Sequence, residues 1–505
     1  MHFNIKKRAN NLLQPGEGLY QRTVRSGAWA FALRITGQGF SIARLIILAR
    51  VLAPNDFGLL GIALLAMMTM ETFSQTGFQQ ALIQKKGNIK DYLDAVWTVS
   101  ALRGLMLFAI LFFIAPYIAA FFNAPVATPI IRIIGLASLL QGLTNIGVIY
   151  FQKELEFNKQ FIYRASGTLA DFVVAVAAAL ILRSVWALVF GLLAGNLVRL
   201  IVSYLVHPYH PHFKLDLAKT KELFGFGKWI LGSSILMFLI TQGDDIFVGK
   251  LLGVTLLGFY QMAYRFSNAP ATEISHVISQ VTFPAYSKLQ DKLPVLRETY
   301  LKVLQLTAFI AIPLAGGIFI LVPEFTQIFL TPKWLPMVPA TQVLALYGLL
   351  RALGATTGGL FMAVGKPEMR TKIQSAQLIL LAILIYPLTM HWGILGTSMA
   401  VTAYALIFNL VAIYKVLNIV KSDYKKPSKL LILPLIGTLI MISAIFVLKT
   451  YIFHDVGLAY FVLLIVAGIL TYLLIAYLFD RLLNYGSKQL IQDQFAVLFQ
   501  KPKRP

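Results

Sequence analysis

The sequence predicts an all-α polytopic membrane protein of about fourteen transmembrane helices: two pseudo-symmetric six-helix lobes followed by two extra helices. Three observations lead there. Of the 505 residues 58% are apolar and only 13% are charged, whereas charged residues make up roughly a quarter of a soluble protein. Apolar runs of about 20 residues, long enough to cross a bilayer, follow one another along the chain. Finally, segments in the first half recur in the second half.

The apolar runs are separated by short polar joints, which give each predicted helix its ends. The spans expected from the sequence are 28–52, 57–83, 95–115, 130–150, 165–182, 185–206, 229–251, 255–283, 301–322, 339–364, 373–390, 394–416, 430–448 and 458–479.

The formal charge of +23 is distributed as the positive-inside rule requires, and not on one soluble face as in a nucleic-acid-binding protein. Every second joint is rich in lysine and arginine, whereas the joints between them hold only Arg183, Lys333 and Lys449. We therefore expect a multi-pass protein with both termini in the cytoplasm. No nucleic-acid partner is expected.

The second half of the chain echoes the first at a shift of about 200 positions. Gly27 and Trp29 correspond to Gly227 and Trp229, and Gly58 corresponds to Gly258. Parallel six-helix repeats are a transporter architecture, although apolar segments also resemble one another by chance. The expected organisation is a cytoplasmic segment, an N-lobe, a cytoplasmic linker able to act as a hinge, a C-lobe, the two extra helices and a cytoplasmic tail, at 1–27, 28–206, 207–228, 229–416, 417–479 and 480–505.

Arginines at membrane depth are the clearest functional signal, because a charge in hydrocarbon must face a cavity or a partner. Arg34 and Arg44 lie on one stripe of the first helix with Gln38. Further arginines from the second half are Arg265 and Arg351. The planar guanidinium suits phosphate oxygens, so the set predicts a cationic cavity. The alternative is internal ion pairing, with Glu71, Asp171, Asp244, Asp245 and Glu273 as the available carboxylates.

Asp244 and Asp245 are adjacent in the seventh predicted helix. Two neighbouring carboxylates cannot both ionise cheaply without a nearby cation, so they are candidates for coupling to a proton or Na⁺. Pairing with Lys250 or Arg265 is the alternative. No other cofactor is expected.

Several chemistries are not supported by the sequence. It has no cysteine, and His207, His210 and His212 lack further ligands at metal-site spacing. No Walker-type glycine loop or serine-nucleophile motif is present. The joints expected outside are short and poor in titratable residues, so a membrane glycosyltransferase or polymerase is the weaker interpretation. We expect a transporter and not an enzyme.

Three segments carry a resemblance to a known family: Ala49–Gly58 with the sequence ARVLAPNDFG, Gln152–Phe157 with QKELEF, and Phe283–Gln290 with FPAYSKLQ. They resemble the polysaccharide-transporter branch of the multidrug/oligosaccharidyl-lipid/polysaccharide exporter superfamily. Within it the chain is most similar to Wzx-type flippases of the colanic and teichuronic acid kind. The likeness covers nearly the whole chain.

The resemblance implies two lobes that form a V, alternate access, and move an undecaprenyl-pyrophosphate-linked oligosaccharide across the bacterial inner membrane. The related lipid II flippase has cavity arginines on helices 1 and 8 and a cation-site aspartate on helix 7, the helices that here carry Arg34, Arg44, Arg265 and Asp244 or Asp245.

In this interpretation the arginines attract the pyrophosphate. The sugars would meet Gln38, Tyr260, Tyr264 and Asn268. We expect a monomer in contact with membrane lipids, and the resemblance leaves room for partners in the polysaccharide polymerase or export machinery. A cation-coupled drug antiporter of the same superfamily is the main alternative, but it would favour an acidic cavity.

Overall fold

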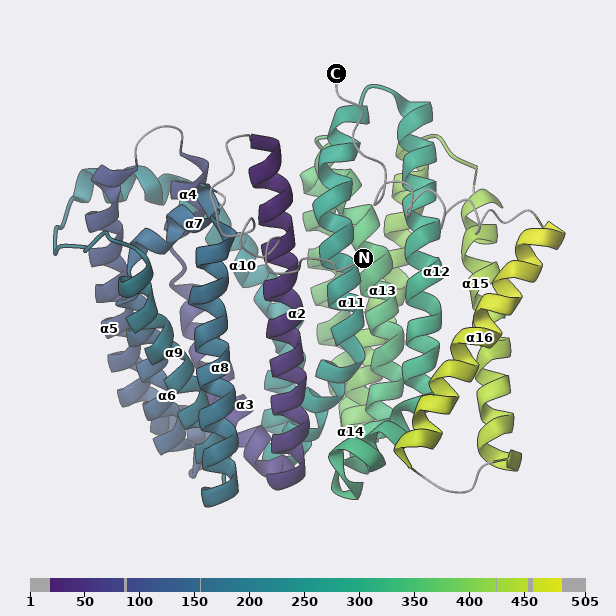
Figure 1. Cartoon of the computed structure of the whole chain (residues 1–505), viewed down its shortest axis with the longest axis horizontal. Coiled ribbons are helices and arrows are strands. Elements are labelled where there is room, and N and C mark those ends of the chain that lie inside the picture. Colours follow the sequence, from purple (N-terminus) through teal and green to yellow (C-terminus); the bar gives the residue numbers. More distant parts are fainter. Residues whose placement is uncertain (1–18, 86–88, 155, 424, 453–456, 484–505) are drawn as a thin grey trace, which may run out of the picture. The chain divides into compact units, whose positions relative to one another are not determined.

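A computed structural model describes residues 19–85, 89–154, 156–423, 425–452 and 457–483, and every regular element in these ranges is a helix (Figure 1). The predicted all-α class is therefore confirmed. The chain divides into two compact units, Met1–Gly258 and Phe259–Pro505. Most of the predicted N-terminal segment and C-terminal tail lies outside the described residues.

The first unit contains ten helical segments within its described residues. They are α2 (Leu19–Val51), α3 (Pro54–Phe73), α4 (Phe78–Gln84), α5 (Lys90–Phe121), α6 (Ala127–Gly142), η1 (Ile146–Val148), α7 (Ile149–Lys153), α8 (Phe157–Leu182), α9 (Trp186–Val206) and α10 (Leu217–Leu251). Helix α8 packs against α9 and α2. Small residues allow these close approaches: a Cβ on Gly195 would lie 2.8 Å from the backbone oxygen of Gly167.

The second unit is built from long helices that follow α11 (Val254–Leu289), whose first turn still belongs to the first unit. Its core contains Tyr286, Tyr300 and Leu360, all fully buried. The further elements are α12 (Leu293–Phe325), η2 (Thr326–Leu330), η3 (Pro332–Met337), α13 (Val338–Ala363), α14 (Pro367–Ile419), α15 (Lys425–Val447), η4 (Leu448–Ile452) and α16 (Leu458–Leu483).

The 53-residue helix α14 contains a break at Gly393, whose φ of 58° and ψ of −137° are not helical. Glycine tolerates this positive φ because it has no Cβ. The predicted spans 373–390 and 394–416 lie on either side of this residue. Helix α14 is thus continuous in its hydrogen bonding, but its backbone dihedral angles divide it into two helical segments at Gly393.

Ten helices in the described part of the chain are long and apolar enough to cross a membrane, or eleven if one bent pair counts as a span. The predicted number of fourteen is not confirmed by this criterion. The prediction of a continuous helix over 130–150 is wrong, because α6 ends at Gly142 and the chain bends by 69° into the segment Ile146–Lys153. Asn145 stabilises the new start by accepting a hydrogen bond from the backbone N–H of Gly147 at 2.8 Å.

The sequence echo has a counterpart in space, where the first turns of α3 and α11 cross. A Cβ on Gly58 would lie 1.9 Å from the backbone oxygen of Val254, and one on Gly258 would lie 2.0 Å from that of Pro54. The two contacts are equivalent under the 200-residue shift, because Gly58 corresponds to Gly258 and Pro54 corresponds to Val254. The crossing therefore has local two-fold character, and both positions require glycine because no side chain fits.

The segment after α9 is extended and lies against the first unit. Asp94 accepts hydrogen bonds from the Tyr209 hydroxyl and from the His212 backbone N–H. Asn145 donates to the Tyr209 carbonyl at 2.5 Å, and the His207 ring stacks on Tyr150 with 5.5 Å between centroids. Helix α10 then starts at Leu217, before the predicted start of the seventh span at 229. The linker that the sequence suggested as a hinge is thus short and its first part is anchored.

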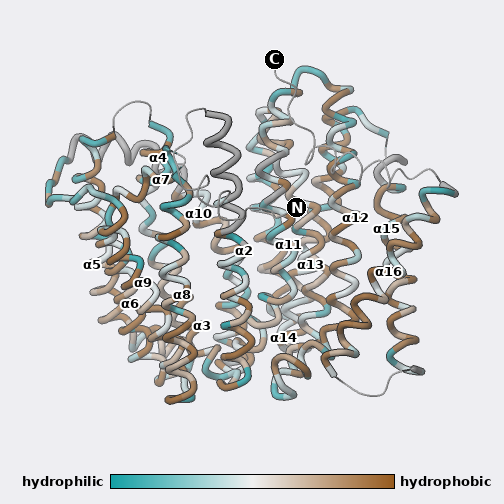
Figure 2. The backbone as a smooth tube through the Cα atoms, in the orientation of Figure 1, coloured by the Kyte–Doolittle hydropathy of each residue, from teal (hydrophilic) through white to brown (hydrophobic). Residues whose placement is uncertain are grey.

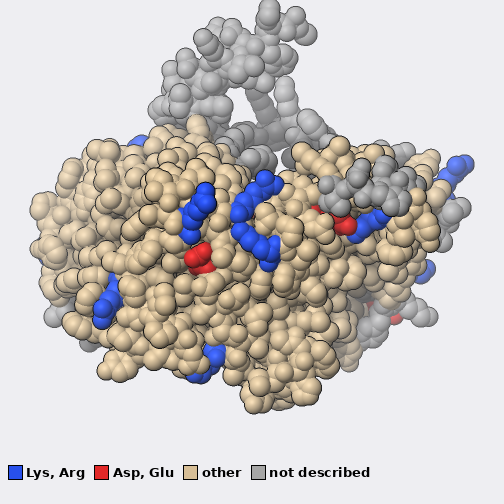
Figure 3. Space-filling view, turned by 90° about the horizontal axis from the view of Figure 1, so that it is seen from below, with Lys and Arg blue, Asp and Glu red and all other residues tan. Residues whose placement is uncertain are grey.

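Hydropathy and charge follow the helices. Figure 2 shows hydrophobic residues along the middle of most helices and hydrophilic residues towards their ends and joints. The view from below in Figure 3 shows isolated charged side chains on a surface that is otherwise neutral. Both features are typical of helices in a bilayer.

Candidate anion-binding site

Arg351 occupies a polar cluster in the second unit. Its Nη1 donates hydrogen bonds to Asn268 Oδ1 at 3.1 Å and, more weakly, to the Tyr264 hydroxyl at 3.4 Å. Tyr264 and Asn268 are four residues apart, so they lie on one face of α11 towards α13. A close crossing brings the two helices together: a Cβ on Gly348 would lie 2.9 Å from the backbone oxygen of Ser267. Three of the residues that the sequence singled out therefore meet.

Two further tyrosines extend the cluster. The guanidinium carbon of Arg351 lies 6.0 Å from the ring centroid of Tyr347, within the range of a cation–π interaction. The ring of Tyr347 is 5.9 Å from that of Tyr264 and 6.2 Å from that of Tyr404. The Tyr404 hydroxyl donates to the Tyr347 hydroxyl at 3.3 Å. The arginine is thus held by neutral aromatic and amide groups.

The charge of Arg351 is not balanced by a carboxylate in the described part of the chain. Both of its hydrogen bonds use Nη1, so the edge formed by Nε and Nη2 makes none within these residues. That edge carries two parallel N–H donors, the geometry with which arginine binds carboxylate or phosphate in a bidentate manner. An arginine in a helix long and apolar enough to cross a membrane, with this edge available, is suited to an anion.

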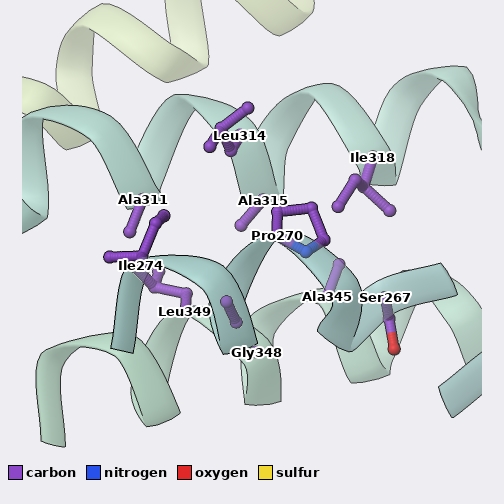
Figure 4. Close-up of a pocket in the computed structure, with 11 residues that line it drawn as sticks. Ser267, Pro270, Ile274, Ala311, Leu314, Ala315, Ile318, Ala345, Gly348 and Leu349 are labelled. Atoms are coloured by element: carbon purple, nitrogen blue, oxygen red, sulfur yellow. The ribbon is translucent and has the colours of Figure 1, made fainter. Parts of the chain in front are cut away.

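A small apolar pocket borders the same helix crossing, since Ser267 and Gly348 are among the residues that line it. Its walls come from α11, α12 and α13, and Figure 4 shows Pro270 opposite Ala315 and the Ser267 hydroxyl directed away from the pocket. That hydroxyl donates to the Tyr264 carbonyl and accepts from the Asn268 amide. The side chains that line the pocket are therefore apolar apart from Ser267, and the hydroxyl of Ser267 bonds within α11.

Arg44 has a different environment, in the first unit. Its Nη2 lies 3.0 Å from Asp171 Oδ1, and the two side chains are 15% and 22% exposed. Asp171 is on α8, packed against glycines of α9: a Cβ on Gly191 would lie 2.9 Å from Asp171 Oδ1. For Arg44 the structure shows the internal ion pair that was the alternative to a substrate contact.

The other predicted site residues lie on α2, α10 and α11. Gln38 and Arg265 are exposed, Arg34 is partly exposed, and Tyr260 is fully buried. Asp244 is 2% exposed, and Asp245 next to it is partly buried. Their roles in binding sugar, pyrophosphate or cation stay predictions.

Tyr347 and Tyr404 are the members of the cluster that the sequence analysis missed. Tyr347 precedes Arg351 by one helical turn, so the i, i+4 spacing on α13 was a usable signal. Tyr404 comes from α14, and nothing in the sequence indicated which face of that helix meets α13.

No group of three or more His, Asp or Glu side chains in the described ranges could hold a metal ion. The three histidines of the linker instead make separate contacts. His207 stacks on Tyr150, His210 Nδ1 lies 2.9 Å from the Pro208 carbonyl oxygen, and the backbone N–H of His212 donates to Asp94. Burial and the positive charge of Lys159 lower the pKa of His207, which favours the neutral ring. Burial and the hydrogen bond to Asp94 raise the pKa of Tyr209, which keeps its hydroxyl protonated.

The fold is that of a polytopic transporter. It matches the solved structure of the lipid II flippase MurJ with a TM-score of 0.71 at 18% identity, over 91% of this chain and 99% of that one. An inward-facing multidrug resistance transporter of the MATE family matches with a TM-score of 0.57 at 15% identity, over 76% of this chain and 95% of that one. At these identities the likeness establishes the fold alone.

Residues 47–339 match the family described as polysaccharide biosynthesis protein, and the chain belongs to that family. A similar protein is the lipopolysaccharide biosynthesis protein WzxC of Escherichia coli strain K12, 27% identical over 70% of this chain and 72% of that one. A membrane protein of the cps region of Klebsiella pneumoniae is 27% identical over 88% of this chain and 93% of its own.

The teichuronic acid biosynthesis protein TuaB of Bacillus subtilis strain 168 is 27% identical over 61% of this chain and 65% of its own. The family and these relatives confirm the resemblance to Wzx-type proteins that the sequence motifs indicated. They also agree with the expectation of a membrane transporter and not an enzyme.

Proposed function

We propose that this protein is a flippase that moves a lipid-linked oligosaccharide, carried on undecaprenyl pyrophosphate, across the membrane for surface polysaccharide biosynthesis. One observation in the structure carries the proposal: Arg351 has neutral partners and a bidentate edge suited to phosphate oxygens. The names of the relatives, which refer to lipopolysaccharide, teichuronic acid and lipid II, support the same class of substrate.

The chemistry follows from the cost of moving a charged headgroup through hydrocarbon. A pyrophosphate and its sugars lose their hydration there, which is prohibitive without replacement contacts. Arg351 supplies charge to the phosphate oxygens, and the hydroxyls and rings of Tyr264, Tyr347 and Tyr404 offer hydrogen bonds and flat apolar faces to sugar rings. The lipid tail stays in the bilayer.

The remaining features of the proposal rest on sequence. The pattern of basic joints supports an inner-membrane protein with both termini in the cytoplasm. A single chain with its own anion site needs no second copy, so we propose a monomer. Asp244 and Asp245 stay candidates for coupling to Na⁺ or a proton.

The test is complementation of a strain that lacks this protein and accumulates its lipid-linked oligosaccharide. Arg351→Gln should abolish surface polysaccharide while the variant remains in the membrane at normal amounts. Arg481→Gln, which removes an exposed arginine at the end of α16, is the matched control and should export normally. Normal export by Arg351→Gln, or a drug-resistance phenotype without any change in surface glycan, would overturn the proposal.

A further inference from the structure

Helix α12 contains two prolines in its interior, Pro313 and Pro323. A proline has no N–H, so the carbonyl four residues before it loses its helical hydrogen bond, and the helix can bend there. The carbonyls freed in this way belong to Phe309 and Phe319. In a membrane helix such groups need a donor from a neighbouring helix, because lipid supplies none. Both carbonyls of α12 have such a donor.

The two donors come from different parts of the second unit. Gln342 of α13, a helix of the predicted six-helix repeat, donates to the Phe319 carbonyl at 3.0 Å. The hydroxyl of Tyr472 donates to the Phe309 carbonyl at 2.9 Å. Tyr472 lies on α16, one of the two extra helices that follow the repeat. The break at Pro313 is therefore closed by a helix that the repeat itself does not contain.

The extra helices form a C-terminal helix pair, α15 with η4 and α16, that packs against α12 (Figure 1). Before Pro313, the ring of Tyr472 packs on that of Phe309 with 5.4 Å between centroids. After Pro313, Lys449 Nζ of η4 donates to the Ile320 carbonyl at 3.0 Å. The pair thus binds the backbone of α12 on both sides of the proline.

The Tyr472 hydroxyl gives the Phe309 carbonyl its hydrogen bond. Tyr472 is 7% exposed, so this bond lies among packed helices, where a carbonyl without a donor is costly. A change of bend at Pro313 moves the Phe309 carbonyl relative to α16 and breaks the bond. The bond therefore favours the bend that α12 has in this structure.

We propose that the C-terminal helix pair controls the bend of α12, and that Tyr472 is the positioning residue that sets this bend at Pro313. While the hydrogen bond is intact, the two parts of α12 keep one arrangement. When the bond breaks, α12 bends at Pro313 and the part beyond the proline moves. The role of this bend in translocation rests on the proposed function.

The experiment measures distances by pulsed electron paramagnetic resonance on the full chain in nanodiscs of phosphatidylcholine. The chain has no cysteine, so two introduced cysteines carry the spin labels. Phe319→Cys on α12 beyond Pro313, and Met390→Cys on α14, replace exposed side chains. Tyr472→Phe should raise the share of a second distance population roughly 2- to 10-fold, the change expected for the loss of one neutral hydrogen bond.

A double-variant cycle assigns the effect to the proline. Pro313→Ala restores the N–H that binds the Phe309 carbonyl, so in that background Tyr472→Phe should leave the distances unchanged. Tyr477→Phe, which removes an exposed hydroxyl from the same helix, is the matched control and should also leave them unchanged. Equal effects of Tyr472→Phe with and without Pro313→Ala would overturn the inference. So would unchanged distances in Tyr472→Phe, even with a lower unfolding temperature, since the hydroxyl would then only stabilise packing.

A second label pair tests whether the movement is confined to the part of α12 beyond Pro313. Lys302→Cys precedes the proline on α12, and Lys372→Cys lies near the start of α14; both replace exposed side chains. This pair should give the same distance with and without Tyr472→Phe. A change as large as that of the first pair would mean a general loosening of the second unit and would contradict a bend at Pro313.

The distances are measured without substrate, so their outcome is separate from that of the proposed function. In complementation, Tyr472→Phe should lower export a few-fold at normal amounts in the membrane, and normal export would contradict the role of the bend in translocation. Normal export by Arg351→Gln would contradict the flippase proposal and leave the bend unaffected. Conversely, unchanged distances in Tyr472→Phe leave the role of Arg351 unaffected.

Discussion

Arg44 and Arg351 are both arginines on long helices of a membrane protein, but their surroundings differ in charge. Arg44 lies 3.0 Å from a carboxylate, whereas Arg351 lies among tyrosines and an asparagine and donates only to neutral oxygens. The first arrangement compensates the charge of the arginine inside the protein. The second leaves a positive charge for a ligand. An arginine in a predicted membrane helix is therefore not sufficient evidence of a binding site. Whether it is available to a ligand depends on whether a carboxylate of the protein already neutralises it.

The largest expected effect is on the arginine with neutral partners. Hydrogen bonds to a charged group contribute about 1.5–3 kcal/mol, and each 1.4 kcal/mol is tenfold in affinity. Arg351→Gln should therefore weaken binding of undecaprenyl pyrophosphate roughly 10- to 100-fold, as measured by titration in nanodiscs at pH 8. Arg351→Lys should lose most of this affinity too, because a lysine lacks the bidentate edge. A lysine variant that binds as the wild type would show that charge alone is sufficient.

The next largest effect is on the free energy of unfolding, which should distinguish the Arg44–Asp171 ion pair from Arg351. Removing one partner of a buried ion pair costs about 3–5 kcal/mol, and partial exposure should reduce this to about 1–2 kcal/mol for Asp171→Ala. The measurement is thermal unfolding in detergent. The double variant Arg44→Met with Asp171→Leu should recover stability, since an apolar pair replaces the charges.

Arg351→Met should not destabilise the protein in the same way, because it leaves no carboxylate unpaired in the described structure. Equal destabilisation by Arg351→Met and Asp171→Ala would mean that both arginines are structural, and the contrast between them would be lost.

A smaller effect is expected from the hydroxyls around Arg351. Tyr404→Phe removes a 3.3 Å hydrogen bond to Tyr347, and a neutral hydrogen bond contributes about 0.5–1.5 kcal/mol. Export of polysaccharide should fall only a few-fold, and titration in nanodiscs should show a similar loss of affinity. A loss as large as that of Arg351→Gln would instead indicate that the tyrosine contacts the pyrophosphate.

The smallest effect concerns the pH dependence of stability that arises at His207. The pKa of this histidine is lowered in the folded protein by burial and by Lys159. Its contribution to stability is therefore present above the unfolded pKa of about 6.5 and is lost as the pH falls through the lower folded pKa. His207→Phe keeps the aromatic contact with Tyr150 and should flatten this part of a melting-temperature profile between pH 8 and pH 5.

A melting-temperature profile that His207→Phe leaves unchanged would show that other groups of the linker, such as His212 beside Asp94, set the pH dependence.

The class of fold was predictable because transmembrane helices have long apolar sequences, and the segments that connect them are polar. The bend after Gly142 was not, because the run from 130 to 150 stays apolar while Asn145 starts a new helix within it. Sequence also placed Tyr264, Asn268 and Arg351 among the candidates. It could not decide whether Arg44 pairs with Asp171, because that depends on which faces of α2 and α8 meet.

The crossing of α3 and α11 has a consequence for how the halves of this chain can diverge. Gly58 and Gly258 each leave room for a backbone oxygen of the other helix. The same steric constraint therefore acts at both positions. A methyl group at either position forces the same two helices apart, while Gly37, which has nothing within 4 Å, tolerates one. The two halves can differ in their arginines and carboxylates as function requires. At this crossing they must remain copies of each other.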